Sequence, residues 1–299
     1  MKKMLLALTL AFAANFANAQ DKKKDSIPPN GWTKDGNIQL LFNQSAFNKE
    51  WKGGGTSSVS GNLTLNYDLN YRMNDFTWDN KLLANYGLTK TKDDEFTRKT
   101  SDRIEFNSIA GKQLTDSNWY YSYFFNFRSQ IAKGYEYSED TDTGETIRTE
   151  TTHFFSPAYL QTGPGMMWKK NDNFMFNIAP ATARFIFVDD VFTSEVDYVD
   201  GDYFGVDQGK SSRFEFGASI SALATFEILE NVNMENSINL YSNYLDNPGN
   251  IDIDYLMNME MTINRYLSAN LLFQAIYDDN AVGAFQIREV FGLGINYKI

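Results

Sequence analysis

Apolar and polar residues alternate along most of this chain, and this period of two constrains the fold more than any other feature. In residues 59–70 the odd positions are mostly apolar and the even positions are polar, and residues 252–264 repeat the pattern. A helix would distribute these apolar residues around its axis, whereas a strand gathers them on one face. The pattern therefore predicts strands.

The alternating segments number about twelve, and many are longer than the roughly five or six residues that are usual in soluble sheets. They reach the about 9–11 residues that a tilted strand needs to cross a bilayer. The expected strands are 37–47, 57–72, 75–90, 102–114, 117–132, 156–170, 173–188, 212–228, 231–245, 251–264, 266–278 and 285–299.

Short turns and long loops alternate between these segments. The long or Gly/Asp-rich connections are 48–56, 91–101, 133–155, 189–211, 246–250 and 279–284. This rhythm is typical of outer-membrane barrels. A soluble β-sandwich or propeller also alternates in hydrophobicity, but it does not account for strands of this length with this loop pattern. We therefore expect an all-β fold, an antiparallel up-and-down transmembrane β-barrel over residues 37–299, with both termini on the periplasmic, short-turn side.

The N-terminal segment predicts export. Lys2 and Lys3 precede an almost unbroken apolar run, and Ala17-Asn18-Ala19 has the small-x-small pattern of a signal-peptidase site. The run is shorter than the about 20 residues that a spanning helix needs. Residues 1–19 are thus expected to be a cleaved signal peptide, and residues 20–36 a flexible periplasmic tail. The expected location is the bacterial outer membrane.

The two faces of the expected strands differ in charge. The predicted lipid-facing set, which includes Leu63, Tyr121, Phe214 and Leu271, contains no charged residue. Three polar residues, Gln44, Asn236 and Glu289, depart from this rule, and the alternation shifts phase near Pro180. The opposite face is expected to form a structural charge network in the lumen, which consists of Asp79, Lys81, Arg103, Glu105, Arg128, Arg213, Glu215, Glu260 and Arg288.

Composition excludes several classes of function. The formal net charge of −11 disfavours a nucleic-acid partner. The chain has no cysteine and one histidine, His153, so we expect no cofactor, no metal centre and no enzymatic activity. His153 and Ser156 are three residues apart in a strand-like stretch and should face opposite ways. The acidic loops 133–155 and 189–211 are expected to form a solvated outer surface, with calcium binding as the less favoured alternative.

Two features of the sequence resemble known proteins. The last strand is apolar at every second position from Phe291 to Ile299, which resembles the terminal strand that barrel-insertion machinery recognises. The motif Trp51-Lys52-Gly53-Gly54-Gly55, followed by Ser57-Ser58-Val59-Ser60, resembles an uncharacterised outer-membrane β-barrel family of Bacteroidota, a domain-of-unknown-function family. The Leu65-Asn66-Tyr67 stretch and the ending from Arg288 to Gly294 resemble it too. The resemblance implies a fold and a location but no activity.

We interpret Trp51, Gly53, Gly54 and Gly55 as a structural outer-loop motif, in which Trp51 anchors the interface and the glycines allow a tight turn.

A barrel of twelve strands tilted by about 40° has a backbone diameter of roughly 24 Å, which side chains fill to leave at most a narrow channel. Charges of both signs on neighbouring strands favour a braced interior. The sequence therefore predicts an accessory or structural barrel, or a subunit of an envelope complex. The alternative is a narrow porin or transporter for small solutes. The expected partners are outer-membrane lipid, the insertion machinery and, for the accessory role, other envelope proteins.

Overall fold

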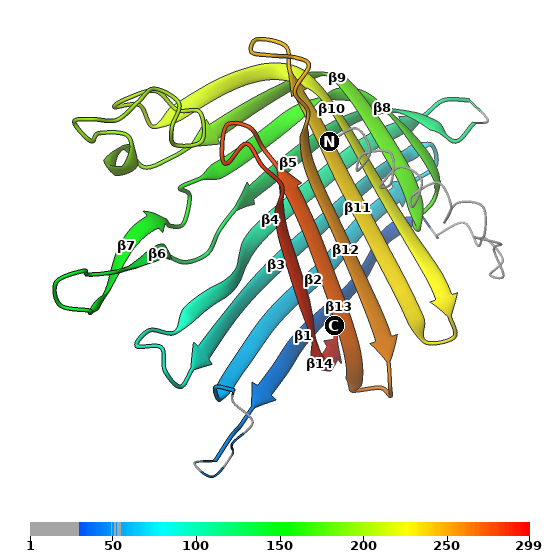
Figure 1. Cartoon of the computed structure of the whole chain (residues 1–299). Coiled ribbons are helices and arrows are strands. Elements are labelled where there is room, and N and C mark those ends of the chain that lie inside the picture. Colours follow the sequence, from blue (N-terminus) through cyan, green and yellow to red (C-terminus); the bar gives the residue numbers. More distant parts are fainter. Residues whose placement is uncertain (1–29, 49, 51, 53–54, 116) are drawn as a thin grey trace.

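The computed structural model is a closed antiparallel β-barrel with a small hairpin attached to it (Figure 1). It describes residues 30–299 except 49, 51, 53–54 and 116. The predicted signal peptide, residues 1–19, and most of the predicted tail lie outside the described residues. Around the ring the strands follow the order β1-β14-β13-β12-β11-β10-β9-β8-β5-β4-β3-β2, so the described chain contributes twelve strands to the barrel, as predicted.

The barrel strands are β1 (Gly31–Ser45), β2 (Ser58–Met73), β3 (Phe76–Thr91), β4 (Arg98–Gln113), β5 (Trp119–Ser129), β8 (Ala158–Asn171), β9 (Phe174–Phe187), β10 (Ser212–Leu229), β11 (Val232–Asn243), β12 (Asp252–Thr262), β13 (Leu267–Tyr277) and β14 (Gln286–Lys298). The last strand closes the ring on the first, with Ile38 opposite Tyr297 and Phe42 opposite Leu293. We call the end that carries the tight turns the short-turn end and the opposite end the long-loop end.

Two predicted boundaries need correction. β1 begins at Gly31 rather than at residue 37, because residues 31–36 pair in register with Tyr67–Arg72 of β2. The expected tail therefore ends six residues earlier than predicted. The 133–155 loop also has structure of its own: β6 (Gly134–Glu139) and β7 (Thr146–Thr152) form a two-stranded hairpin. Figure 1 shows this hairpin projecting from the barrel wall at the left of the view.

Burial in this molecule is the reverse of that in a soluble protein. Large apolar side chains on the outer surface are exposed, Tyr121 to 63% and Leu293 to 62%, whereas Arg184 and Glu215 are almost fully buried. In soluble proteins such charged residues are mostly on the surface. A barrel whose outward face contacts lipid and whose interior is polar produces this inversion. The predicted division between apolar and charged faces is confirmed. No helix in the described part of the chain is long and apolar enough to cross a membrane.

The polar exceptions on the outward face have local explanations. Asn236 pairs in register with Ala224 of β10 and Met257 of β12, so it does face outward. The Tyr255 hydroxyl donates to Asn236 Oδ1 at 2.8 Å, which shields that amide oxygen. Gln44 and Glu289 lie toward the long-loop ends of β1 and β14. The predicted phase shift near Pro180 is confirmed, because the register of β9 with β8 and with β10 slips there.

Candidate functional site

The candidate functional site is the barrel lumen, where the predicted charged residues lie on β3, β4, β5, β10, β12 and β14. The structure distributes them over three levels instead of one network. Asp79 and Lys81 lie near the short-turn end; Arg103, Glu105, Arg128 and Arg288 occupy the middle; Arg213 and Glu215 lie toward the long-loop end. Glu260 stands apart and accepts a hydrogen bond from Asn296 Nδ2 at 3.0 Å.

The first level is an ion pair that spans the lumen. Lys81 Nζ on β3 lies 2.8 Å from both carboxylate oxygens of Glu235 on β11. These two strands are six places apart in a ring of twelve, so they stand on opposite walls. Asp68 Oδ1 lies 3.9 Å from the same ammonium group. This ion pair therefore connects opposite walls of the barrel.

Lys169 forms a second bridge at this level. Its ammonium group lies 2.7 Å from Asp79 Oδ2 and 2.8 Å from Asp172 Oδ1. Charges of both signs on neighbouring strands were expected to brace the lumen. Asp79 and Lys81, however, lie opposite Ile109 and Asn107 of the neighbouring strand β4, and their shortest ion pairs are with Lys169 of β8 and Glu235 of β11.

The middle level is a buried cluster around Asp254 of β12. Its carboxylate accepts from Arg103 Nη2 of β4 at 2.8 Å and from Arg128 Nη1 of β5 at 2.5 Å. Arg103 also bonds Glu105 on its own strand. β4 and β12 are again six places apart, so this cluster too joins opposite walls. Arg288 extends it through Gln274, whose Oε1 accepts from Arg288 Nη2 at 3.0 Å, and also bonds Ser101 of β4.

The third level is centred on Arg184 of β9, which is 2% exposed. Its guanidinium group bonds Asp252, lies 3.2 Å from Asp278 Oδ2 and is 3.6 Å from Glu215 Oε2. The rings of Tyr159 and Tyr241 flank it at 5.1 and 4.7 Å from their centroids. Arg213 then connects Glu215, at 2.9 Å, to the long loops.

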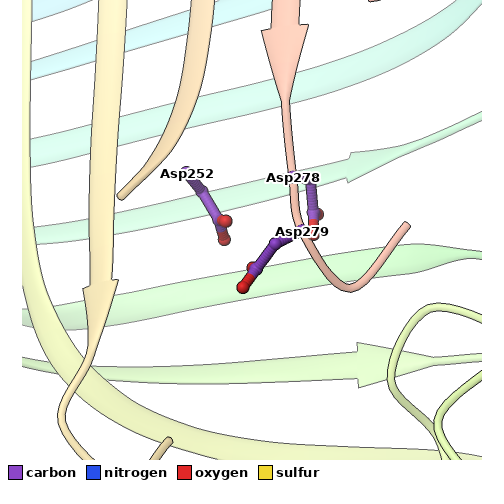
Figure 2. Close-up of side chains that lie close together, drawn as sticks. All are labelled: Asp252, Asp278 and Asp279. Atoms are coloured by element: carbon purple, nitrogen blue, oxygen red, sulfur yellow. The ribbon is translucent and has the colours of Figure 1, made fainter. Parts of the chain in front are cut away.

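The carboxylates of Asp252, Asp278 and Asp279 lie close together at this level (Figure 2). One oxygen of each lies within 4.8 Å of the others. Each already has a protein donor. Arg184 bonds the first two, and the Asn250 amide bonds Asp279. The arrangement is therefore an ion-pair cluster whose negative charge the buried arginine offsets in part.

The free space in the lumen shrinks from one end of the barrel to the other. A cavity of about 450 Å³ lies toward the short-turn end, where Asp172 and Asn173 of the β8–β9 turn line it. A second cavity of about 180 Å³ shares Asp68, Lys81 and Glu235 with the first. Beyond Glu105 and Asn126, the space among the Arg184 cluster is only about 40 Å³. The buried arginines thus fill the long-loop half.

Outside the barrel, His153 joins two of the long loops. Its Nδ1 lies 2.9 Å from Glu150 Oε1 of β7, and its Nε2 lies 3.3 Å from Asp189 Oδ2. The hydrogen bond from Lys133, and then that with His153, lowers the pKa of Glu150. The backbone N–H of Val191 lowers the pKa of Asp189, with a smaller contribution from His153.

The Ser156 hydroxyl and the His153 imidazole bind different groups. Its oxygen accepts the backbone N–H of Asp189 at 2.8 Å, while the imidazole is engaged by two carboxylates. His153 and Ser156 pair with each other in an antiparallel bridge, with a backbone hydrogen bond in each direction. The expectation that they lie in one continuous strand and face opposite ways is therefore wrong.

Of the outer-loop motif, Trp51, Gly53 and Gly54 lie outside the described residues. Gly55 has φ of +110°, which favours glycine, and a Cβ there would lie 2.8 Å from the Phe47 ring.

Sequence reasoning missed several partners of the predicted charges. Asp252, Asp254 and Asp278 carry the bonds of Arg103, Arg128 and Arg184 but were not among the predicted residues. Asp252 and Asp254 do alternate with apolar neighbours at the start of β12, so their lumen position was available from the pattern. The pattern could not show which arginines they bind, because those arginines lie on strands that are far away in the sequence.

Comparison with known proteins adds a family of unknown function. The profile of a family described as "Protein of unknown function (DUF3078)" matches residues 42–135, about a third of the chain. This agrees with the expected resemblance to a domain-of-unknown-function family. No curated protein matches the sequence.

Among solved structures, several membrane barrels align over most of the chain. The COG4313 outer membrane channel from Pseudomonas putida F1 is 11% identical with a TM-score of 0.38, and 93% of this chain and 98% of that one are covered. The translocator domain of the autotransporter NalP from Neisseria meningitidis is 8% identical with a TM-score of 0.33, over 99% and 97% of the two chains. The outer membrane channel DcaP of Acinetobacter baumannii is 11% identical with a TM-score of 0.30, over 94% and 100%. Identities and scores this low say nothing of the activity of this chain.

Proposed function

We propose that this protein is an outer-membrane barrel that does not conduct solutes and acts as an accessory or structural subunit of the envelope. The observation that carries the proposal is the Lys81–Glu235 bridge together with the Arg103–Asp254 contact, since each joins opposite walls of the barrel. A wide pore keeps its walls apart and its lumen hydrated. Here charged side chains from both walls meet at hydrogen-bonding distance.

The long-loop half supports the same proposal. Arg184 is buried against three carboxylates and two tyrosine rings, in a region with only about 40 Å³ of free space. Removing an arginine from such a cluster leaves buried carboxylates uncompensated. The charges therefore hold each other in place, and a passing ion would have to separate them.

The location rests on several independent features. The signal-peptide pattern of residues 1–19 and the apolar terminal strand point to export and to barrel-insertion machinery. The exposed apolar outer surface requires lipid around it. We place the short-turn end and both termini in the periplasm, and the acidic long loops outside the cell. The motif around Gly55 supports an origin in Bacteroidota. The lumen serves structure and not catalysis, so the protein is not an enzyme.

Planar-bilayer recording tests the closed lumen. The full-length mature protein, with insertion verified by heat-modifiable migration and protease protection of liposome samples, is expected to give no stable conductance steps. Stable single-channel steps from the unmodified protein would overturn the proposal and favour the narrow porin. The accessory role predicts envelope proteins that co-purify in mild detergent and are lost in a variant without the β6–β7 hairpin. Recovery of the barrel alone from cross-linked membranes would count against that role.

A further inference from the structure

We propose that the short-turn half of the lumen is a binding vestibule for a small neutral polyhydroxyl solute, of about the size of a mono- or disaccharide. Its volume of about 450 Å³ falls within the range of about 300–1,000 Å³ that is usual for ligand pockets. Glu105 and Asn126 line both this cavity and the small space beside the Arg184 cluster, so they mark its limit on the long-loop side. A ligand therefore enters from the short-turn end, which is the periplasmic side if the proposed orientation holds.

Two of the three lysines that line the vestibule are already paired. Lys81 is held by Glu235 and Asp68, and Lys169 is held by Asp79 and Asp172. A charged ligand would have to break these pairs and leave one partner uncompensated. A neutral ligand leaves them intact. Carboxylates outnumber lysines among the lining residues, so the field disfavours an anion in particular.

Amide and hydroxyl side chains make up most of the remaining polar lining, and they include Asn107, Asn126, Gln161, Asn177, Ser221 and Ser237. Each of these groups offers both donor and acceptor capacity, which matches the hydroxyl groups of a sugar. Asn177 is the most informative of them. It is 2% exposed, its Oδ1 accepts from the Ser122 hydroxyl at 2.6 Å, and its Nδ2 has no hydrogen-bond partner among the described residues. A buried amide with a spare donor is uncommon and calls for an acceptor from outside the chain.

One wall of the vestibule is apolar. Ile109 and Phe124 line it and belong to a packed cluster with Met167, against which Met175 lies. An apolar patch beside convergent amides suits a pyranose ring, whose C–H face is apolar and whose rim carries hydroxyls. The combination favours a sugar-like solute over a purely polar ion.

Saturation-transfer NMR on the full-length mature protein tests the vestibule, with maltose as the neutral probe, glucuronate as the anion and spermidine as the cation. The detergent is lauryldimethylamine oxide, because maltoside detergents carry the headgroup of the probe. We expect transfer to maltose and none to glucuronate. Ser237→Phe on the lumen face of β11 is expected to reduce the maltose signal at least tenfold. The matched control is Ile238→Phe, which faces outward on the same strand and should leave the signal unchanged.

If Ser237→Phe does not fold, as judged by heat-modifiable migration, Ser221→Leu on β10 replaces it. The proposal is overturned if maltose shows no transfer, if both phenylalanine variants retain it equally, or if only spermidine binds. Binding is measured in detergent without a membrane, so its failure is distinct from failure of the closed-barrel proposal, which conductance decides.

Discussion

The ion pair between Lys81 and Glu235 predicts an energetic coupling between two strands on opposite walls. At 2.8 Å, Coulomb's law with an effective dielectric constant of about 20 gives roughly 6 kcal/mol of attraction before desolvation. Net values for hydrogen bonds to charged groups are about 1.5–3 kcal/mol. The two side chains are 19% and 30% exposed, so screening by lumen water favours the lower half of that range. We therefore expect a coupling energy of about 1.5–2 kcal/mol.

A double-mutant cycle measures this coupling. The variants are Lys81→Met, Glu235→Gln and their combination, and the assay is urea unfolding in detergent micelles followed by tryptophan fluorescence. The control cycle uses Lys112 and Asp75, an exposed pair at 3.6 Å, for which about 0–1 kcal/mol is expected. A coupling below about 0.5 kcal/mol, on the scale where distant sites simply add, would refute the cross-lumen bridge.

Three further predictions concern other contacts. Arg184→Met should lower the free energy of unfolding by about 3–5 kcal/mol, because it leaves buried carboxylates unpaired; a loss below about 1 kcal/mol in the same urea assay would contradict the buried cluster. On the lipid face, Tyr255→Phe should destabilise the barrel by about 1–3 kcal/mol, because it leaves Asn236 Oδ1 without its donor. The same change in an Asn236→Leu background should be near neutral. Equal losses in both backgrounds would rule out a stabilising hydrogen bond between Tyr255 and Asn236. The pKa values of Glu150 and Asp189 are both lowered in the folded state. Their contact with His153 should therefore persist above the ordinary carboxyl pKa of about 4 and weaken as pH falls below it. Unchanged hydrogen exchange in the β6–β7 hairpin at about pH 3, after correction for intrinsic rates, would argue against this contact.

The strands and their faces were predictable because they depend on local alternation. Leu63 and Tyr121 were assigned to lipid from the period of two alone, and the phase shift at Pro180 was visible as a break in that period. The start of β1 was not visible, because Lys34 and Asp35 are polar neighbours that extend a strand past the apolar band. Pairing with β2 fixes that segment, and pairing is not a local property.

The ion pairs in the lumen could be predicted only in part. The sequence shows which charges face inward, but Lys81 and Glu235 are 154 residues apart and Arg103 and Asp254 are 151 apart. Their contact depends on closure of the ring, because strands that are six places apart in a ring of twelve stand on opposite walls. A chain that closed with a different stagger would bring other pairs together from the same inward-facing set.

The β6–β7 hairpin could not be predicted from the sequence pattern either. Its register pairs Tyr137 with Arg148 and Glu139 with Thr146, so it lacks the apolar face that marks the barrel strands. Contacts with the β3–β4 loop and with the first residue of β4 hold it. The Phe96 ring lies 5.9 Å from the Tyr137 ring, and the guanidinium group of Arg98 lies 4.7 Å from the centroid of the same ring. Such contacts leave no periodic trace in the sequence.

Spin labels along β12 test most directly whether a closed cylinder sits in lipid with its apolar side chains outward. The chain has no cysteine, so single cysteines at 257, 258, 259 and 260 can each carry one label in liposome-inserted protein. Labels in place of Met257 and Met259 should collide with oxygen and be shielded from a water-soluble nickel complex, and labels in place of Asn258 and Glu260 should show the opposite preference. Equal nickel accessibility at all four positions, or a protein that stays dispersed in water without detergent, would contradict the lipid-embedded barrel.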